Sequence, residues 1–317
     1  MEKFSSIKDV NIYFLKTHKT GGSAVNNVLY RLAIKRGMNY TKIWKNSPIN
    51  LTEPRIFAQH FIHNSTLVRP FFPKNKSIYI TIIRNPVEQI LSRWNYNPEQ
   101  RDLIDNFFRL FYNKTNNSNS SNFSFTRKEV NYFKCLTRNL MSYYLGIVGC
   151  GGIYTGSKGH LLKKFQQDFD LVLLTEYFSE GMILLKKLLN LSYEDIVCLS
   201  VNEGLKEPSK SQRELAEEII PRESNADYIL YNYYKKFYQD ISPLVQDEVK
   251  VLKRLNRQYQ NQCTIGREEK YFFGQVPYKA YRLNENLLPK IKKMCWLLTR
   301  TDHEIREVFT KFREIIF

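Results

Sequence analysis

A stretch near the N-terminus, Lys16-Thr17-His18-Lys19-Thr20-Gly21-Gly22-Ser23-Ala24, places lysines, hydroxyls and two glycines directly after a short apolar run. Adjacent glycines let a ligand approach the backbone closely, and amide groups at the start of a helix attract negative charge. The stretch therefore predicts an oxyanion site with Lys19 as its central cation. A nucleotide triphosphatase loop has its lysine after the last glycine, so an ATPase or kinase is disfavoured. A plain glycine turn capped by Ser23 is the alternative.

A second candidate anion site follows another apolar run. Arg84-Asn85-Pro86 comes directly after it, and Ser92 lies eight residues beyond Arg84. The guanidinium is a planar fork suited to phosphate, and Ser92, two turns into the next helix, can reach the same anion. The alternative is an ion pair between Arg84 and Glu88 on one helix.

Histidine supplies the candidate general base. His60 precedes the second apolar run, and its ordinary pKa lies near neutral pH, as a base requires. His18 adjoins Lys19, and either a supporting catalytic role or a structural one fits it. His63 reads as part of a polar surface loop, and His160 and His303 read as solvated side chains.

Three strand, loop and helix units must position these groups. Apolar runs at 11–16, 77–83 and 170–174 are each followed by a polar loop and a helical pattern, which begins at Ser23, at Pro86 and at Ser179. Continuous apolar strands alternating with helices predict an α/β fold, a parallel sheet flanked by helices. Ligands of such sheets bind at the carboxyl ends of the strands, which brings the three loops to one crevice.

The rest of the chain is expected to complete a single domain over 1–317. A polar stretch at about 113–126 reads as an insertion, and about 244–317 reads as a helical C-terminal region. Separate helices are expected at 228–238 and 244–259, and a last one at 302–317.

Composition limits the class of ligand. Lys and Arg outnumber Asp and Glu 48 to 31, a net charge of +17 that favours an anionic partner. We expect no metal, because the five cysteines lack zinc-binding spacing. A Cys263–Cys295 disulfide is one open possibility, and Cys198 reads as a core thiol. The chain shows no signal peptide or membrane anchor.

The motifs together resemble the galactose 3-O-sulfotransferase family over roughly residues 10 to 240. The resemblance rests on the Lys-Thr-His-Lys-Thr-Gly-Gly-Ser loop, the Arg84 to Ser92 pair, Gln59-His60, Arg138-Asn139-Leu140 and the block at 169–178. Asn85 departs from the family's usual Asp, at a turn position that tolerates either residue. Family members usually begin with a membrane anchor and stem, and the lack of one in this sequence is the second departure.

The resemblance implies a P-loop-like sulfotransferase that uses 3′-phosphoadenosine 5′-phosphosulfate (PAPS). The loop that begins at Lys16 would hold the 5′-phosphosulfate, and Arg84 with Ser92 the 3′-phosphate. Lys19 would stabilise the bridging oxygen, and His60 would deprotonate the acceptor. For Arg138 and Glu176 a substrate contact is expected, while a surface ion pair and a capping or Lys-pairing carboxylate fit them equally.

The implied acceptor is the 3-hydroxyl of galactose on a glycolipid or glycoprotein, in the Golgi lumen. One alternative is the same chemistry on another glycan, such as heparan sulfate. Another is a catalytically silent basic module that binds glycans or nucleic acid. Nucleic acid is not expected, because the helical spacing of the aromatics at 231–238 explains them as core. The oligomeric state stays open.

Overall fold

The computed structural model describes residues 10–41, 43, 54–96, 101, 104, 105, 108, 126–200, 204, 207–272 and 276–314. The polar insertion expected at about 113–126 lies outside these residues except for Thr126. The hydroxyl of Thr126 accepts a hydrogen bond from the amide of Glu129 and so caps helix α5 (Arg127–Thr137).

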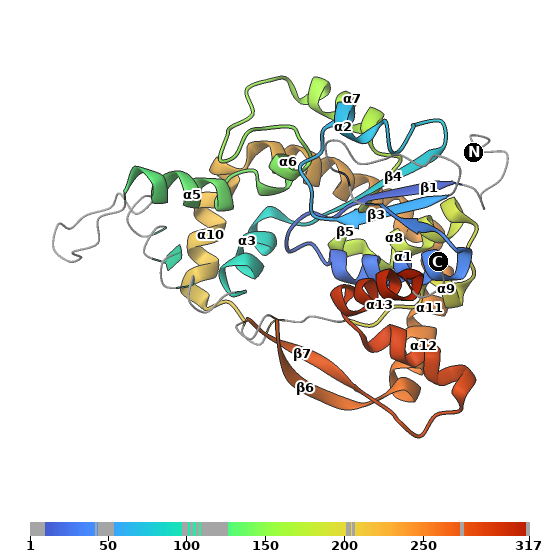
Figure 1. Cartoon of the computed structure of the whole chain (residues 1–317). Coiled ribbons are helices and arrows are strands. Elements are labelled where there is room, and N and C mark those ends of the chain that lie inside the picture. Colours follow the sequence, from blue (N-terminus) through green and yellow to red (C-terminus); the bar gives the residue numbers. More distant parts are fainter. Residues whose placement is uncertain are drawn as a thin grey trace.

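A five-stranded parallel sheet forms the centre of the fold, with the strand order β2-β3-β1-β4-β5 (Figure 1). Its strands are β1 (Asn11–Leu15), β2 (Asn39–Tyr40), β3 (Arg55–Gln59), β4 (Ser77–Ile83) and β5 (Leu171–Leu174). β1, β4 and β5 are buried along their whole length, because helices cover both faces of the sheet. This is why they appear in the sequence as continuous apolar runs. The expected α/β fold class is confirmed.

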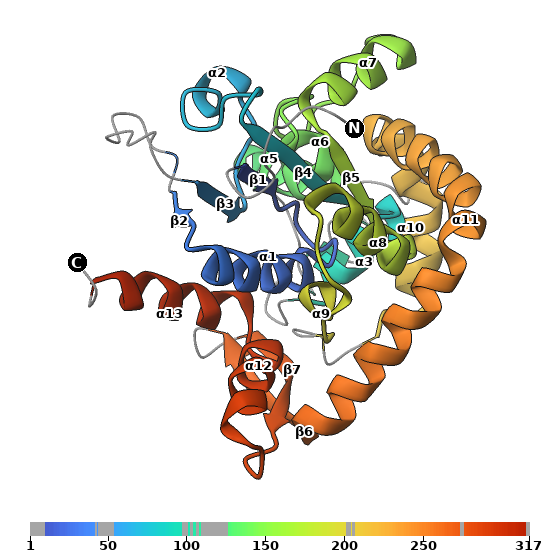
Figure 2. The same cartoon turned by 90° about the vertical axis from the view of Figure 1, so that its right-hand side faces the viewer.

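Side chains of each strand alternate between two cores. Ile12 and Phe14 of β1 face a core shared with helices α1, α8 and α13, whereas Tyr13 and Leu15 face one shared with α6, α7 and the first half of α11. Figure 2 shows α11 passing along one side of the molecule, and buried residues of its two halves belong to different cores. The helices are α1 (Gly22–Arg36), α2 (Ser65–Val68), α3 (Pro86–Trp94), α6 (Leu140–Tyr144), α7 (Lys158–Asp168), α8 (Phe178–Leu189), α9 (Tyr193–Ile196), α10 (Lys210–Glu223), α11 (Asn225–Cys263), α12 (Pro289–Thr299) and α13 (Asp302–Glu314).

All three expected strand, loop and helix units are present. β1 leads into α1, β4 into α3 with Pro86 at its first position, and β5 into α8 through a 3₁₀ turn, η2 (Thr175–Tyr177). The hydroxyl of Thr175 lies within hydrogen-bond distance of the carbonyl oxygens of Thr20 (2.7 Å) and Ile83 (3.0 Å), so one side chain joins the ends of three strands. The sequence pattern also suggests Ser179 as the cap of the third helix, which is wrong: α8 begins at Phe178 and has no side-chain cap.

The C-terminal region departs from the helical expectation. Strands β6 (Thr264–Phe272) and β7 (Val276–Leu283) form an antiparallel hairpin there, between α11 and α12. Alternation of buried and exposed side chains along β7, such as buried Tyr278, exposed Lys279 and buried Ala280, is the period of a strand with one solvated face. In addition, the two helices expected at 228–238 and 244–259 are one continuous helix, α11, which passes through Pro243.

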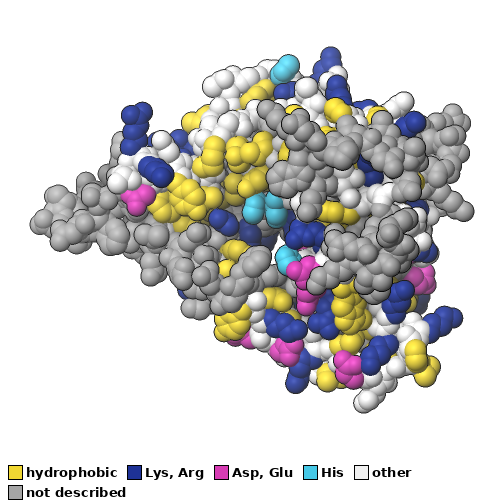
Figure 3. All heavy atoms as spheres, in the orientation of Figure 1, with side chains coloured by type: hydrophobic (Ala, Val, Ile, Leu, Met, Phe, Trp, Pro, Cys, Tyr) yellow, Lys and Arg dark blue, Asp and Glu magenta, His cyan; other side chains and the backbone are white. Residues whose placement is uncertain are grey.

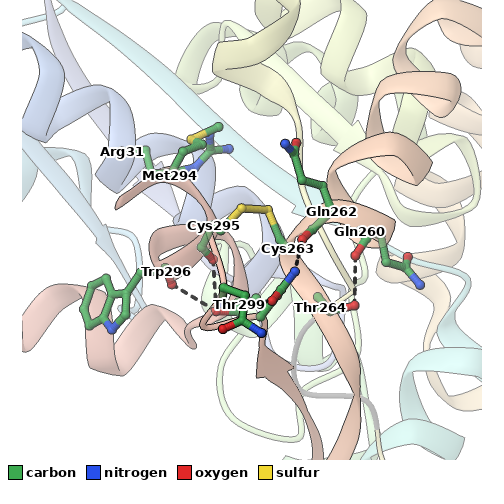
Figure 4. Close-up of a disulfide and its surroundings, with 11 residues drawn as sticks. Arg31, Gln260, Gln262, Cys263, Thr264, Met294, Cys295, Trp296 and Thr299 are labelled. Carbon is green, nitrogen blue, oxygen red and sulfur yellow. Dashed lines mark hydrogen bonds between the residues drawn. A yellow bond between two sulfur atoms is a disulfide. The ribbon is translucent and has the colours of Figure 1, made fainter. Parts of the chain in front are cut away.

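Two disulfides cross-link the chain. Cys263–Cys295 ties the end of α11 to α12 (Figure 4), which confirms the bridge that the sequence left open. Cys135–Cys150, which sequence analysis did not anticipate, closes the segment that contains α6. Cys198 is a buried free thiol, as expected. Among the described residues, none of the helices has the length and apolar character needed to cross a membrane.

Candidate active site

The loop between β1 and α1 is shaped by its own hydroxyls. Thr17 and Thr20 are fully buried; the Thr17 hydroxyl donates to the carbonyl oxygen of Ile82 (2.5 Å), and that of Thr20 to the carbonyl oxygen of Thr17 (3.1 Å). Both threonine hydroxyls are therefore already engaged in hydrogen bonds that fix the loop. Thr17 and Thr20 can therefore offer a ligand their backbone far more readily than their side chains.

The N-terminus of α1 is open toward an anion. Gly21 is its N-cap residue, at φ +78°, a left-handed conformation that favours glycine. The helix has no side-chain cap and no acidic residue in its first turn, and the amides of Gly21 and Gly22 have no acceptor among the described residues. Unpaired amides at a helix N-terminus bind oxyanions. The open amides therefore lie where the sequence predicts an anion site, and the amide of Ala24, further along the same turn, donates to the carbonyl oxygen of Gly21 (3.1 Å).

Lys16 lies across the first turn of α1. A Cβ atom on Gly22 would come within 2.6 Å of its Cγ, so glycine is required for the lysine to lie there. The ammonium group donates to the Ser23 hydroxyl (3.0 Å) and to a carboxylate oxygen of Asp302 (2.6 Å). Asn26 donates to the same oxygen (2.9 Å).

Lys19 is the cation most affected by its neighbours. Its backbone is left-handed, at φ +61°, and its ammonium nitrogen lies 3.5 Å from the centre of the Tyr96 ring. Burial, followed by the positive charges of Arg93, Lys16 and Arg84, lowers the pKa of Lys19 to about 7. Such crowding of like charges indicates a site that an anion would relieve.

Arg84 turns back toward the first loop. Its guanidinium donates to the carbonyl oxygen of Lys19 (3.2 Å) and lies 3.8 Å from Glu88, the partner of the alternative interpretation. Glu88 is shared with Arg213, which contacts it through a short hydrogen bond. Burial lowers the pKa of Arg84, whereas the carboxylates of Glu88 and Glu176 act in the opposite direction, so its charge is partly neutralised.

Ser92 and Arg93 follow on α3. No hydrogen bond of the Ser92 side chain is found in the described part of the chain. Arg93, which sequence analysis missed, has a buried Nε atom without a partner there, and its charge lowers the pKa of both Lys19 and His18. The signal in the sequence is its position beside Ser92 on the same helix. Arg93 is therefore a fourth cation of the site, with Lys16, Lys19 and Arg84.

His18 and His60 come together beside these cations. Their rings are stacked, with centroids 3.8 Å apart, and Tyr144 of α6 lies 4.7 Å from the His18 ring. The Nδ1 atom of His60 is 2.8 Å from the carbonyl oxygen of Lys16. Because a carbonyl oxygen only accepts, Nδ1 carries the proton and Nε2 keeps its lone pair. Figure 3 shows histidine side chains near the middle of one face, next to lysine and arginine.

Both imidazoles resist protonation. Burial, followed by the neighbouring charge of His60 and the nearby cations, lowers the pKa of His18 to about 2. His60 is exposed at the rim, yet loss of water from its ring, followed by the charge of Lys16, lowers its pKa to about 4. At neutral pH both rings are neutral, and His60 can accept a proton at Nε2.

Both residues for which a substrate contact is expected have partners within the chain. Arg138 forms a close ion pair with Glu223 at the end of α10, and among the described residues no contact joins it to the loops of the site. A carboxylate oxygen of Glu176 accepts from the amide of Asn85 (2.9 Å), the N-cap residue of α3. The alternatives of an ion pair for Arg138 and a capping carboxylate for Glu176 therefore describe their observed contacts.

One histidine differs from its expected surface position. His63 is 6% exposed, with Nδ1 3.2 Å from the Tyr13 hydroxyl and Nε2 3.8 Å from Asp168. The polar residues around it in the sequence gave no sign of this burial, which results from packing against β1. No group of three or more His, Cys, Asp or Glu side chains that could hold a metal ion occurs in the described ranges.

Comparison with known proteins identifies the family of the chain. The family model described as Galactose-3-O-sulfotransferase matches residues 5–271. Human galactose-3-O-sulfotransferase 3 is 26% identical over 223 residues, 62% of this chain and 48% of that protein. Mouse galactose-3-O-sulfotransferase 2 is 23% identical over 287 residues, 82% and 71% of the two chains. Human galactosylceramide sulfotransferase is 26% identical over 215 residues, 61% and 48% of the two chains.

The chain spans about half the length of the galactose-3-O-sulfotransferase 3 relatives that it matches. The family match, however, covers most of this chain and includes the anion loop, the Arg84 to Ser92 segment and the histidine pair. These matched residues form the described site, and the chain belongs to the galactose-3-O-sulfotransferase family.

Proposed function

We propose that this protein is a carbohydrate sulfotransferase that moves a sulfuryl group from PAPS to the 3-hydroxyl of a galactose residue. One observation carries the proposal: Lys16, Lys19, Arg84 and Arg93 gather at the uncapped N-terminus of α1, beside the free Nε2 of His60. A cationic anion site next to a neutral base is what transfer of an anionic group to a hydroxyl requires.

The residues present fit such a donor. Unpaired amides at Gly21 and Gly22, together with the partnerless Nε of Arg93, offer donors to sulfate and phosphate oxygens. Arg84 and Ser92 lie on the neighbouring β4 and α3 unit and would receive the 3′-phosphate. The bound donor supplies an activated sulfuryl group with adenosine 3′,5′-bisphosphate as its leaving group. No metal enters this scheme.

The mechanism assigns the proton and the charge to different residues. His60 accepts the proton of the acceptor hydroxyl at Nε2, while the carbonyl oxygen of Lys16 fixes its tautomer through Nδ1. Lys19 donates to the oxygen on which negative charge develops as the sulfur–oxygen bond to phosphate breaks. His18 stacks on His60 and keeps its ring oriented. Arg84 fixes the loop by binding the carbonyl oxygen of Lys19.

The acceptor is proposed from the relatives. Their names state that they act at position 3 of galactose or on galactosylceramide. We therefore infer a galactose-terminated glycan of a glycolipid or glycoprotein, with another glycan such as heparan sulfate as the alternative.

The two disulfides are compatible with an oxidising compartment, and the proposed location is the Golgi lumen. We propose that residues 1–317 form one sulfotransferase domain.

The test is transfer of label from [³⁵S]PAPS to a panel of acceptors. The panel contains β-galactosides, galactosylceramide, 3-deoxygalactosides and desulfated heparan sulfate. Label on galactosides that is lost with the 3-deoxy analogues is the expected result. Label on heparan sulfate alone would replace the acceptor assignment, and no label on any glycan despite binding of adenosine 3′,5′-bisphosphate would remove the enzymatic proposal.

A further inference from the structure

The C-terminal helix α13 reaches into the anion site through one side chain. Asp302, the first residue of α13, lies beyond the 5–271 range of the family match, yet its carboxylate contacts Lys16 (2.6 Å) and Asn26 (2.9 Å). Its side chain is 17% exposed and that of Lys16 is 13% exposed. An ion pair this shielded from water is expected to be far more persistent than a surface pair.

Helix α1 is built to receive this segment. Asn27 donates to the carbonyl oxygens of Leu297 (2.8 Å) and Arg300 (3.2 Å), and so binds the turn between α12 and α13. Arg31, one turn further, contacts Met294 of α12. Asn26, Asn27 and Arg31 therefore form a polar stripe along α1 that fixes the C-terminal segment, with Asp302 at the end nearest the site.

The contact has two consequences for Lys16. First, the ammonium group is kept between Asp302 and Ser23, across the first turn of α1. Second, the carbonyl oxygen of the same lysine accepts a hydrogen bond from Nδ1 of His60. Asp302 therefore holds the side chain of the residue whose backbone orients the base. The carboxylate also offsets the positive charge that Lys16 places near the imidazole.

We propose that Asp302 is a positioning residue of the transfer reaction, which holds Lys16 in the scaffold of the site and screens its charge from His60. The expected loss of kcat rests on the proposed function, whereas the expected shift in the titration of His60 does not. In the described part of the chain, the charged and titratable groups around His60 are Lys16, Lys19 and His18 of the first loop and Asp302 of α13, with Tyr144 of α6 further out. Asp302 is the one acid among them.

The first test measures the titration of His60 without any donor. Histidine-selective ¹⁵N labelling with NMR is applied to the parent, Asp302→Asn, Asp302→Glu and Glu307→Gln, and His60→Gln identifies the signal. Glu307, on the same helix, is a matched control that removes one negative charge away from Lys16. We expect the His60 midpoint to fall by roughly one pH unit in Asp302→Asn, and to stay at the parental value in Glu307→Gln. Asp302→Glu should restore most of the shift.

A charge cycle shows whether Lys16 is the intermediary. Lys16→Met alone should raise the His60 midpoint, and Asp302→Asn should have a clearly smaller effect in that background than in the parent. An unchanged midpoint in Asp302→Asn, or full additivity of the two substitutions, would overturn the inference.

If Asp302→Asn fails to fold, the reactivity of Lys16 in the parent protein still tests the inference. Brief acetylation followed by mass spectrometry should modify Lys16 at least tenfold more slowly than exposed Lys163 of α7, because a paired ammonium group is a poor nucleophile. Equal rates would contradict the proposal. With PAPS and a galactoside, Asp302→Asn should also lower kcat by roughly three- to tenfold with little change in KM. Absent turnover in the parent would refute the proposed function alone, since the titration and acetylation need none.

Discussion

The imidazole rings of His18 and His60 stack almost in parallel, with centroids 3.8 Å apart and planes inclined by 13°. The two histidines come from different loops, one after β1 and one after β3, which pair in parallel through Leu15 and Gln59. Register between the strands therefore sets the contact between the histidines. At neutral pH both rings are neutral, but the half-buried His18 stays within the first loop, while Nε2 of the exposed His60 has no hydrogen-bond partner among the described residues.

The pH dependence follows from the lowered pKa values. His60 must be neutral to act as a base and Lys19 must be charged to stabilise the leaving group. The kcat/KM for the donor should therefore rise with pH through about 4 and fall through about 7, well below the limbs of free histidine and lysine. Once the anionic donor is bound, both pKa values rise, so both limbs of the kcat profile should move to higher pH. Limbs at the same pH in both profiles would contradict this electrostatic account.

His60→Ala should reduce kcat by roughly 10² to 10⁴, the usual contribution of a positioned general base, and spare the affinity for adenosine 3′,5′-bisphosphate. His18→Ala should reduce both rate and nucleotide affinity, because it removes a ring that belongs to the anion loop, stacks on His60 and contacts Tyr144. The discriminating measurement is the acidic limb. If His60→Ala retains that limb and His18→Ala loses it, His18 is the base.

Lys19→Ala should abolish transfer while the protein stays folded. The ammonium group makes no ion pair among the described residues, and its removal relieves repulsion with Lys16, Arg84 and Arg93, so thermal stability should be equal or higher. Lys163→Ala on the exposed face of α7 is the matched control and should keep parental turnover. The assignment fails if Lys19→Ala turns over within tenfold of the parent in the labelled-transfer assay.

Arg84 and Ser92 should determine which nucleotide binds. Loss of a charged hydrogen bond to phosphate costs about 1.5 to 3 kcal/mol, roughly 10- to 100-fold in affinity. Ser92→Ala and Arg84→Ala should therefore weaken adenosine 3′,5′-bisphosphate in calorimetric titrations and change AMP little. Because Arg84 also binds the carbonyl oxygen of Lys19, Ser92→Ala is the cleaner variant. Equal losses for both nucleotides would show that these residues stabilise the loop and do not recognise the 3′-phosphate.

The parts of the site that sequence could predict are local. Lys19, the glycines and Arg84 directly follow apolar strands, and parallel topology brings such loops together whatever the rest of the chain does. Arg93 and Asp302 could not be found in this way. Arg93 enters the site through the orientation of α3, and Asp302 through the docking of a helix that begins 286 residues after Lys16 in sequence. Tertiary packing, which leaves no local pattern, placed both.

The errors in the fold have the same origin. Pro243 lacks an amide hydrogen and is a usual helix breaker, but Tyr238 before it and Val245 and Val249 after it continue one buried stripe, so packing carries α11 through the proline. His63 has polar neighbours in sequence and a buried environment beside Tyr13. In both places long-range burial overrides the local signal.

The Cys263–Cys295 bridge should couple stability to the site. It closes 32 residues and the bridge Cys135–Cys150 closes 15, so loop entropy predicts losses of about 4 and about 3 kcal/mol on removal. Double Cys→Ser variants of each pair, unfolded with urea, would measure these losses. Because α12 and α13 follow Cys263 and deliver Asp302, only the Cys263→Ser/Cys295→Ser variant should also speed acetylation of Lys16. An unchanged urea midpoint for that variant, or equal acetylation of Lys16 in both variants, would show that the bridge does not fix α13 on α1.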